Sequence, residues 1–493
     1  MTGRGFDLAL IALYLVGTTL FGCSFYFRRR GESAADDFTR GGRTLPGWAL
    51  ALSVFATYVS SISFLGLPEK AYASNWSVLA MSASVPLAAI VAAIWFVPFY
   101  RRQTSASAYS FLESRFGVWA RLYASGCFLL MQSARSGMIL LLLALLLNAL
   151  LGFSVPAVIV IVGVATTLYS MMGGLRAVVW TDAIQAVILI VGALVCTVVL
   201  GATLPDGLAA GVRSAWDAGK LSLGSFSLSD WGGETFWVMF AYGIALNLQN
   251  FGFDQSYTQR YVAARTDREA VRSMFAGAMI YVLVSVVFVV IGALLWVWVR
   301  GHAAELPADL LSPGNAKSVF PWFIVNRLPC GVSGLLVAAI IAAAMSTLSA
   351  TLNSGSTVLL EDYFKRFSRR GAAPERQILF LRLATSALGV LAVGVALAAT
   401  GVVSVMTAWL GIQSVLSGGM LGLFLLGAFA RRTRPAQAAV ATTVGVLAVF
   451  WIVFGERLFG LPQLLHVNLA MVVGTLALVV VGFFLTVFTK GRR

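Results

Sequence analysis

Hydroxyl side chains gather in the middle of a long apolar stretch near the start of the chain. Five serines and threonines lie within residues 53–63, and Gly66 and Pro68 follow them. In hydrocarbon an unpartnered polar group costs several kcal/mol, so such a segment is stable only where it faces protein, water or a bound solute. A span that small polar residues interrupt is typical of the discontinuous helices of transporters. The stretch therefore predicts a transport site at mid-membrane.

A second group of small residues, two of them with hydroxyl side chains, lies on one helical face of a later apolar segment. Ala343, Ser346, Thr347 and Ala350 follow one another at offsets of 0, 3, 4 and 7 residues, which places them on the same side of a helix. Two interpretations stay open for this stripe. It could be a close-packed helix interface, because membrane helices pack through small residues. It could also be a Na⁺ site, in which the hydroxyls meet carbonyls freed where residues 56–60 unwind.

Two ionisable residues lie inside apolar segments. Arg135 is central in its span, where a charge costs about 2.5–3.5 kcal/mol on insertion scales, and no acidic residue of that span can neutralise it. It is predicted either to bind the carboxylate of an anionic solute or to bond the carbonyls of a broken helix. Asp182, near the start of another span, is predicted either to cap that helix or to bind a cation.

A third polar interruption runs from Asn247 to Gln255. The first interruption lies near residue 60 and this one near residue 250, so in a five-plus-five arrangement each half opens with an interrupted helix. That correspondence is the expected trace of an inverted repeat. Gln413 and Ser414 of a later span are further polar candidates, either for solute contact or for bridging between helices.

The elements that must position these residues are membrane helices. The chain is 59% hydrophobic and 11% charged over 493 residues, whereas soluble domains carry about 25% charged residues. Apolar blocks of roughly 18–28 residues recur throughout and match the ~20 residues that cross a bilayer. We predict an all-α integral membrane protein with about thirteen spans, at residues 5–28, 45–73, 77–100, 118–152, 155–172, 177–203, 233–258, 272–300, 319–361, 378–400, 403–429, 435–455 and 466–489.

The net charge of +15 does not indicate nucleic-acid binding, because Lys and Arg gather in alternate short loops. Residues 28–30, 101–102, 365–370 and 490–493 are examples. The positive-inside rule makes that side cytoplasmic and leaves the N-terminus outside and the C-terminus inside. We expect a multi-pass protein of the bacterial cytoplasmic (inner) membrane, with no cleavable signal peptide, whose partners are the lipid bilayer, Na⁺ and a small solute.

Three motifs in register give the chain a family resemblance. They are Tyr169–Asp182 (YSMMGGLRAVVWTD), Gln259-Arg260-Tyr261 and the Ala/Ser/Thr stripe after residue 342. Over nearly its whole length the chain resembles the sodium:solute symporter family. Within that family it is most similar to the bacterial sialic acid (N-acetylneuraminate) transporters, whose pattern is matched at Phe55-Ala56-Thr57, Ser60-Ser61-Ile62, Lys70-Ala71-Tyr72 and Arg135.

The resemblance implies a fold and a set of site residues. The fold is the LeuT-type inverted repeat in one transport domain, with an extra N-terminal helix and loop (1–44), a first repeat (45–205), an inverted second repeat (231–429) and two C-terminal helices (430–493). The general Na⁺ site maps onto Ala56, Val59, Ala343, Ser346 and Thr347. A second, weaker Na⁺ site maps onto Asp182, Ser346 and Ser349. Solute contacts map onto Ser60, Ser63 and Arg135, with Arg135 on the carboxylate; Tyr58, Ser82, Asn247 and Gln413 are added as candidates.

The chain departs from the sialic acid group at three positions. Tyr58 replaces a hydroxyl residue and narrows the pocket, and Ser82 replaces a Gln and shortens a donor. Ala350 replaces a hydroxyl ligand of the second ion site, which predicts a site that is weak but present through Asp182.

The expected function is Na⁺-coupled import of a small organic solute by alternating access, with a carboxylate such as sialic acid as the solute. The alternative is a Na⁺ symporter for a neutral sugar, a monocarboxylate or another small solute. We expect no enzyme, because His302 and His466 lie near predicted loop ends and the spans hold no metal-ligand spacing or carboxylate pair. We also expect the protein to function as a monomer.

Overall fold

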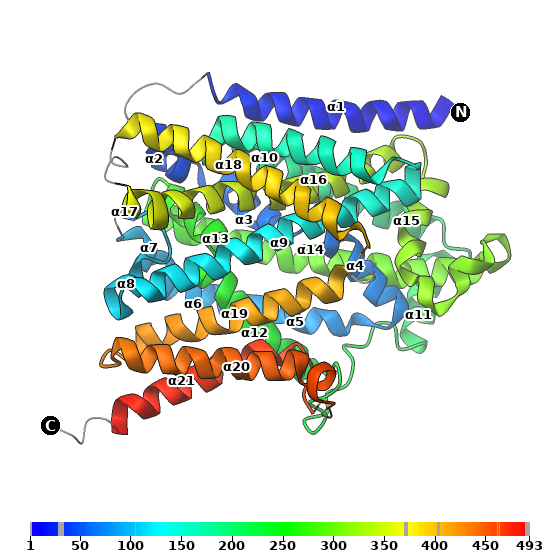
Figure 1. Ribbon diagram of the computed structural model, residues 1–493. Helices are drawn as coiled ribbons and strands as arrows, with labels where there is room; N and C mark the ends of the chain where they lie inside the picture. Colours follow the sequence, from blue (N-terminus) through cyan, green and yellow to red (C-terminus); the bar gives the residue numbers. More distant parts are fainter. Residues whose placement is uncertain are drawn as a thin grey trace.

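The computed structural model describes residues 2–27, 34–103, 105–368, 373–401, 405–460, 462 and 464–488. Its helices run roughly side by side, and the long ones extend from one end of the molecule to the other (Figure 1). Helix α1 (Thr2–Ser24) begins at one end of this bundle, and α21 (Leu469–Phe488) finishes at the opposite end. Chain ends on opposite sides correspond to an odd number of crossings.

The helices follow one another along the chain, with the longest connections at 218–235 and 302–315. Up to residue 202 the order is α1, α2 (Ala34–Arg40), α3 (Gly47–Tyr58), α4 (Ser61–Ala73), α5 (Leu79–Ala83), α6 (Val85–Val91), α7 (Val97–Arg101), α8 (Ser110–Phe116), α9 (Val118–Leu151) and α10 (Val155–Ala202). After it come α11 (Gly207–Asp217), α12 (Phe236–Phe253), α13 (Gln255–Ala263), α14 (Asp267–Gly301), α15 (Ala316–Asn326), α16 (Val332–Val358), α17 (Lys365–Phe367), α18 (Pro374–Ala398), α19 (Val405–Phe429), α20 (Pro435–Phe459) and α21.

The predicted interruption of the first polar span is confirmed. Helix α3 stops at Tyr58, Val59 and Ser60 adopt extended backbone (φ −85°, ψ 117° and φ −107°, ψ 172°), and α4 resumes at Ser61. The two halves are bent by 61°. The unwound part is shorter than the predicted 56–60, because the residues up to Tyr58 stay helical.

The second predicted interruption is confirmed as well. Between α12 and α13 the backbone of Asp254 is extended (φ −72°, ψ 118°), and its carboxylate accepts a hydrogen bond from the backbone N–H of Ser256 at 2.7 Å. This cap satisfies one of the amide groups exposed at the start of α13. Both predicted broken helices therefore exist, each with its break inside the bundle.

Helix α10 contains two predicted spans. A straight helix of 48 residues would be about 70 Å long, more than twice the ~30 Å of a bilayer core. The chain instead bends at Gly174, whose φ of 55° and ψ of −155° suit a residue without a Cβ. The break falls between the predicted spans 155–172 and 177–203, within the Gly-Gly motif.

Ten helices of the described residues are long and apolar enough to cross a membrane, or eleven if the bent pair α3–α4 is one span. Each predicted span overlaps a helix or half-helix of the structure, whereas the total of thirteen stays a prediction. The predicted span 319–361 is wrong at its start. Residues 327–331 separate the short helix α15 from α16, and Gly331 in that turn has a φ of 86° that favours glycine.

Helix α16 lies at the centre of the bundle, where 94% of the residues in its most apolar stretch are buried. It packs against α10, while α3 and α4 pack along α14. Two glycines of α14 permit that close approach, because a Cβ at Gly277 would lie 2.6 Å from the Ala51 carbonyl oxygen and one at Gly292 2.3 Å from that of Pro68. Each half of the broken helix thus rests on its own glycine.

Candidate functional site

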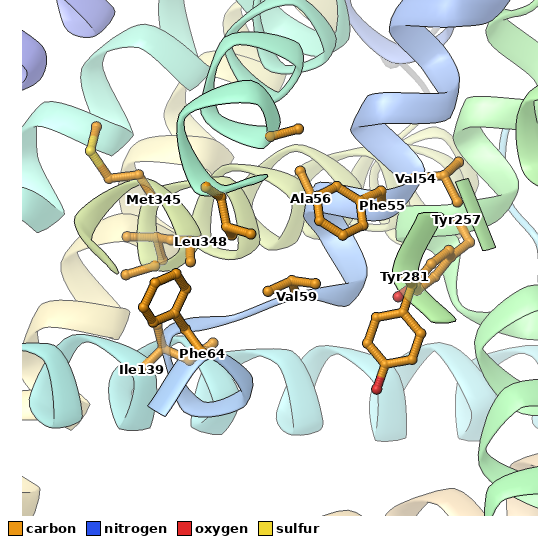
Figure 2. Close-up of a cluster of buried hydrophobic side chains, with 14 of the residues drawn as sticks. Val54, Phe55, Ala56, Val59, Phe64, Ile139, Tyr257, Tyr281, Met345 and Leu348 are labelled. Atoms are coloured by element: carbon orange, nitrogen blue, oxygen red, sulfur yellow. The ribbon is translucent and has the colours of Figure 1, made fainter. Parts of the chain in front are cut away.

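The break between α3 and α4 faces the hydroxyl stripe of α16. Figure 2 shows the chain leaving the end of α3 and running extended past Val59, beside α16. Since α3 ends at Tyr58, the carbonyls of its last turn lack their usual helical donors. The hydroxyl of Ser346 donates to the carbonyl of Ala56 at 3.0 Å, and that of Thr347 reaches the carbonyl of Val59 at 3.5 Å.

One carbonyl of α16 completes the cluster. The oxygen of Ala343 accepts from Ser346 Oγ and from Thr347 Oγ1, each at 3.1 Å. Ala56, Val59, Ala343, Ser346 and Thr347 are all at most 1% exposed. Five uncharged oxygens, from α16 and from the break after α3, thus converge at a buried point. Oxygens of this kind are the ligands that a hard monovalent cation takes. The structure brings together all five residues predicted for the general Na⁺ site; their role as ligands stays a prediction.

Asp182 is not a helix cap. It lies inside α10, eight residues beyond the break at Gly174, and is fully buried. Its Oδ2 accepts hydrogen bonds from Ser53 Oγ at 2.6 Å and from the guanidinium of Arg260 at 2.8 Å, and Arg260 also donates to Ser53 Oγ at 2.7 Å. A buried carboxylate is thereby paired with a buried guanidinium, as desolvation of either charge requires.

The predicted second ion site is built on this pair. Oδ1 of Asp182 is 3.4 Å from Ser349 Oγ, which also donates to the Ser346 carbonyl at 3.0 Å. Ala350 is buried beside them and supplies no side-chain oxygen. Asp182, Ser346 and Ser349 are therefore close together, but the negative charge that would attract a second cation is already compensated by Arg260.

Arg135 lies on α9 and makes no hydrogen bond or ion pair with any described residue. It is partly exposed, in contrast to its buried neighbours Gln132 and Ser136. Gln132, three residues earlier on α9, donates a hydrogen bond to Asp254, so Arg135 lies near the break of the second broken helix. A guanidinium with free N–H groups in the membrane interior is poised for a carboxylate that it can hold with two parallel hydrogen bonds.

The carboxylate opposite Arg135 is held in place by other groups. Asp254 Oδ2 accepts from Gln132 Nε2 at 2.9 Å, and Oδ1 caps α13. Gln132 lies three residues before Arg135, so the two side chains share one face of α9. The break in α12–α13 thus presents a fixed negative charge to a free positive one, without a direct bond between them.

Tyr58 and Asn247, both predicted as solute contacts, are bound to each other. The Tyr58 hydroxyl donates to Asn247 Oδ1, and Asn247 Nδ2 donates to Ser84 Oγ at 2.9 Å. The Tyr58 ring lies 3.9 Å from that of Tyr281, between centroids. Tyr58 therefore fills space between the first broken helix, α12 and α14, and Asn247 has its amide committed to protein groups.

The remaining predicted solute contacts differ in their surroundings. Ser60 is 5% exposed in the break, Ser63 is partly exposed on α4, and neither side chain bonds a described residue. Ser82 is buried with an unpartnered hydroxyl, which leaves it free for a solute or water. Gln413 on α19 is partly buried and bonds none of the other predicted contacts.

Two buried charged residues near the candidate site are not singled out by the sequence analysis. Arg260 is 1% exposed, and its place in the Gln-Arg-Tyr motif is the signal that the sequence offers for it. Asp254 lies within the recognised polar interruption 247–255, but only its hydrogen bond to Gln132 of α9 shows that it lies near Arg135. A single-span search for a counter-charge could not find it.

Comparisons with known proteins agree with this geometry. The model of the sodium:solute symporter family matches residues 38–445. The sodium/sialic acid symporter SiaT of Proteus mirabilis is 31% identical over 92% of this chain and 90% of its own length. A solved substrate-bound, outward-open Na⁺-coupled sialic acid symporter is 30% identical, covers 98% of both chains and has a TM-score of 0.89. The transporter Mhp1 in a closed conformation shares the fold at 16% identity, with a TM-score of 0.55 over 92% of this chain and 94% of its own.

Proposed function

Because the chain belongs to the sodium:solute symporter family, we propose that it imports sialic acid (N-acetylneuraminate) together with Na⁺ by alternating access. The observation that carries this proposal is the pairing of two features across the bundle. A neutral oxygen cluster lies at the first helix break, and a guanidinium without a partner among the described residues lies on α9.

In the proposed cycle Na⁺ is held by the carbonyls of Ala56, Val59 and Ala343 and the hydroxyls of Ser346 and Thr347. These oxygens come from both sides of the α3–α16 contact, so the ion joins the broken helix to the central helix. Holding the break in one shape favours solute binding beside it, and by linkage bound solute favours Na⁺ to the same extent.

The solute carboxylate is proposed to bind Arg135. Asp254 keeps a negative charge near the guanidinium in the empty site, which lowers the cost of holding the cation inside the membrane. A carboxylate that arrives from outside offers two oxygens at bonding distance, which Asp254 does not. Ser60, Ser63 and Ser82 are proposed to bind the polar groups of the solute.

The number of Na⁺ ions sets the driving force. One Na⁺ with a monoanion moves no net charge, so a tenfold Na⁺ gradient supplies only about 1.4 kcal/mol and about tenfold accumulation. A second Na⁺ adds the same gradient term and about 2.3 kcal/mol per 100 mV. We propose that Oδ1 of Asp182 with Ser349 provides this second site and that Arg260 keeps it weak.

Several finer points belong to the proposal. The protein acts as a monomeric carrier, without enzymatic chemistry, in the bacterial inner membrane, with its N-terminus outside. Its two repeats span 45–205 and 231–429. Tyr58 favours the alternative solutes, a smaller monocarboxylate or neutral sugar, because its ring packs tilted against that of Tyr281 where a smaller residue would leave room.

The test is uptake of labelled N-acetylneuraminate into proteoliposomes of the purified full-length protein. An inward Na⁺ gradient should drive accumulation, a K⁺ gradient should not, and internal unlabelled sialic acid should accelerate entry of label by counterflow. Uptake that is equal in Na⁺ and K⁺ would contradict coupling. Na⁺-driven uptake of pyruvate or glucose in place of sialic acid would establish an alternative solute.

A further inference from the structure

A pocket of about 640 Å³ lies away from the transport site, at the end of the bundle where basic residues gather. It is enclosed by the residue after α1, the start of α3, the α10 segment after Gly174 and the loop after α13. Its lining includes the side chains of Thr44, Trp48, Arg176, Trp180 and Arg265. None of them takes part in Na⁺ or solute binding as proposed above.

Two guanidinium groups of this pocket keep N–H donors free. Arg176 uses one nitrogen, Nη2, for Asp37 Oδ1 and Thr44 Oγ1, both at 3.0 Å. Arg265 uses Nε for the Thr44 carbonyl at 2.8 Å. The other nitrogens of both side chains have no partner among the described residues. Asp37 offsets the charge of Arg176, whereas Arg265 makes no ion pair with any described residue.

Two tryptophans form the apolar side of the same pocket. The rings of Trp48 and Trp180 meet edge to face, with centroids 5.3 Å apart and planes at 77°. Trp48 is 59% exposed, although it lies at the first turn of a membrane helix. Tryptophans of this kind sit at the level of lipid headgroups, where the ring contacts acyl chains and the N–H faces water.

We propose that this pocket binds a phosphate-bearing anion, with the phosphate between Arg176 and Arg265 and an attached glycerol or acyl part against Trp48 and Trp180. Arginine forks match phosphate oxygens with paired hydrogen bonds. Basic pockets between membrane helices on the cytoplasmic side are typical binding places for anionic lipid headgroups. A phosphatidylglycerol headgroup and free inorganic phosphate share the recognised chemistry, and only the lipid uses the tryptophans.

The test measures binding to the full-length protein, delipidated in a neutral detergent, by native mass spectrometry and by thermal shift. The probes are phosphatidylglycerol, phosphatidylcholine and inorganic phosphate. We expect phosphatidylglycerol to be retained and to raise the melting temperature, and phosphatidylcholine to do neither. Arg265→Gln should weaken phosphatidylglycerol binding about fivefold, and Arg176→Gln with Arg265→Gln about 25-fold, the factors expected for one and two basic residues at a membrane surface.

The control removes the same charge at the same end of the bundle. Arg102→Gln with Arg432→Gln changes two exposed arginines outside the pocket, and this variant should bind as wild type does. Because Arg176→Gln also breaks the Asp37 pair, Arg265→Gln and Trp48→Ala test the pocket without that change. Equal weakening in the control variant, or equal binding of phosphatidylcholine, would overturn the proposal. If millimolar phosphate competes with phosphatidylglycerol, and Trp48→Ala leaves that competition unchanged, the pocket is supported with free phosphate as its ligand.

Discussion

The two broken helices differ in what they present at their breaks. In α3–α4 the break exposes backbone carbonyls to the hydroxyls of α16, and no charge lies among the five oxygens. In α12–α13 the break is centred on the carboxylate of Asp254, fixed by Gln132 and opposite Arg135. One kind of local structure is thus combined with two kinds of chemistry.

From this difference we infer that the two breaks have separate tasks in symport, with the ion at the first break and the solute at the second. Neutral oxygens lose little on dehydration and release a monovalent ion readily, as an ion that must leave in every cycle requires. Charged groups bind an anion strongly and orient it, but they need compensation while the site is empty. We propose that Asp254 supplies this compensation to Arg135. Variants at the two breaks should therefore change the solute dependence and the Na⁺ dependence of transport separately.

The largest effect is expected at the charged break. Arg135→Gln should weaken transport of an anionic solute on the order of 100-fold, because it removes the charged partner of a desolvated carboxylate. The measurement is the KM for N-acetylneuraminate at saturating Na⁺. The control is Arg300→Gln, which changes an exposed arginine in the last turn of α14. A loss of less than about threefold would show that Arg135 does not bind the solute carboxylate.

A smaller and different effect is expected at the neutral break. Ser346→Ala should raise the Na⁺ concentration for half-maximal uptake about tenfold, since one neutral ligand contributes about 1–3 kcal/mol. The KM for solute at saturating Na⁺ should change little. Thr385→Ala is a matched control, because Thr385 is buried and bonds the carbonyl four residues before it on α18. An unchanged Na⁺ dependence would exclude Ser346 as a ligand.

Asp254→Asn should act through Arg135. Loss of the counter-charge is expected to change the solute KM about fivefold and to leave the Na⁺ dependence intact. In the double variant with Arg135→Gln the two effects should not add, because both belong to one electrostatic unit. Strict additivity would show that Asp254 only caps α13.

The smallest effect is expected for Tyr58→Phe, which removes one hydroxyl and keeps the ring. The lost hydrogen bond to Asn247 is worth about 0.5–1.5 kcal/mol, so solute affinity should change about threefold and the Na⁺ dependence not at all. Tyr58→Thr is the sharper comparison, since it also removes the ring from Tyr281. Faster uptake of sialic acid by Tyr58→Thr alone would show that the ring limits the solute.

The sequence was sufficient for features that depend on local pattern. Hydroxyls within an apolar run located the first break, the amide and carboxyl side chains between Asn247 and Gln255 located the second, and helical spacing placed Ser346 and Thr347 on one face. The pairing of Asp182 with Arg260 could not be predicted, because it joins residues 78 positions apart, on α10 and α13, that only the tertiary fold brings within hydrogen-bond distance. The hydrogen bond between Tyr58 and Asn247 could not be predicted for the same reason. The short helix α15 was not separated from α16 in the prediction, because the apolar residues of one merge with those of the other.

The most direct test of the central claim is equilibrium binding of N-acetylneuraminate to the purified protein by titration calorimetry, with Na⁺ and with K⁺ in its place. The account predicts that Na⁺ tightens solute binding at least about tenfold in the wild type, and that Ser346→Ala shifts this enhancement to higher Na⁺. Tight binding that is the same in Na⁺ and K⁺ would contradict it, because an ion at the first break would then have no influence on the solute.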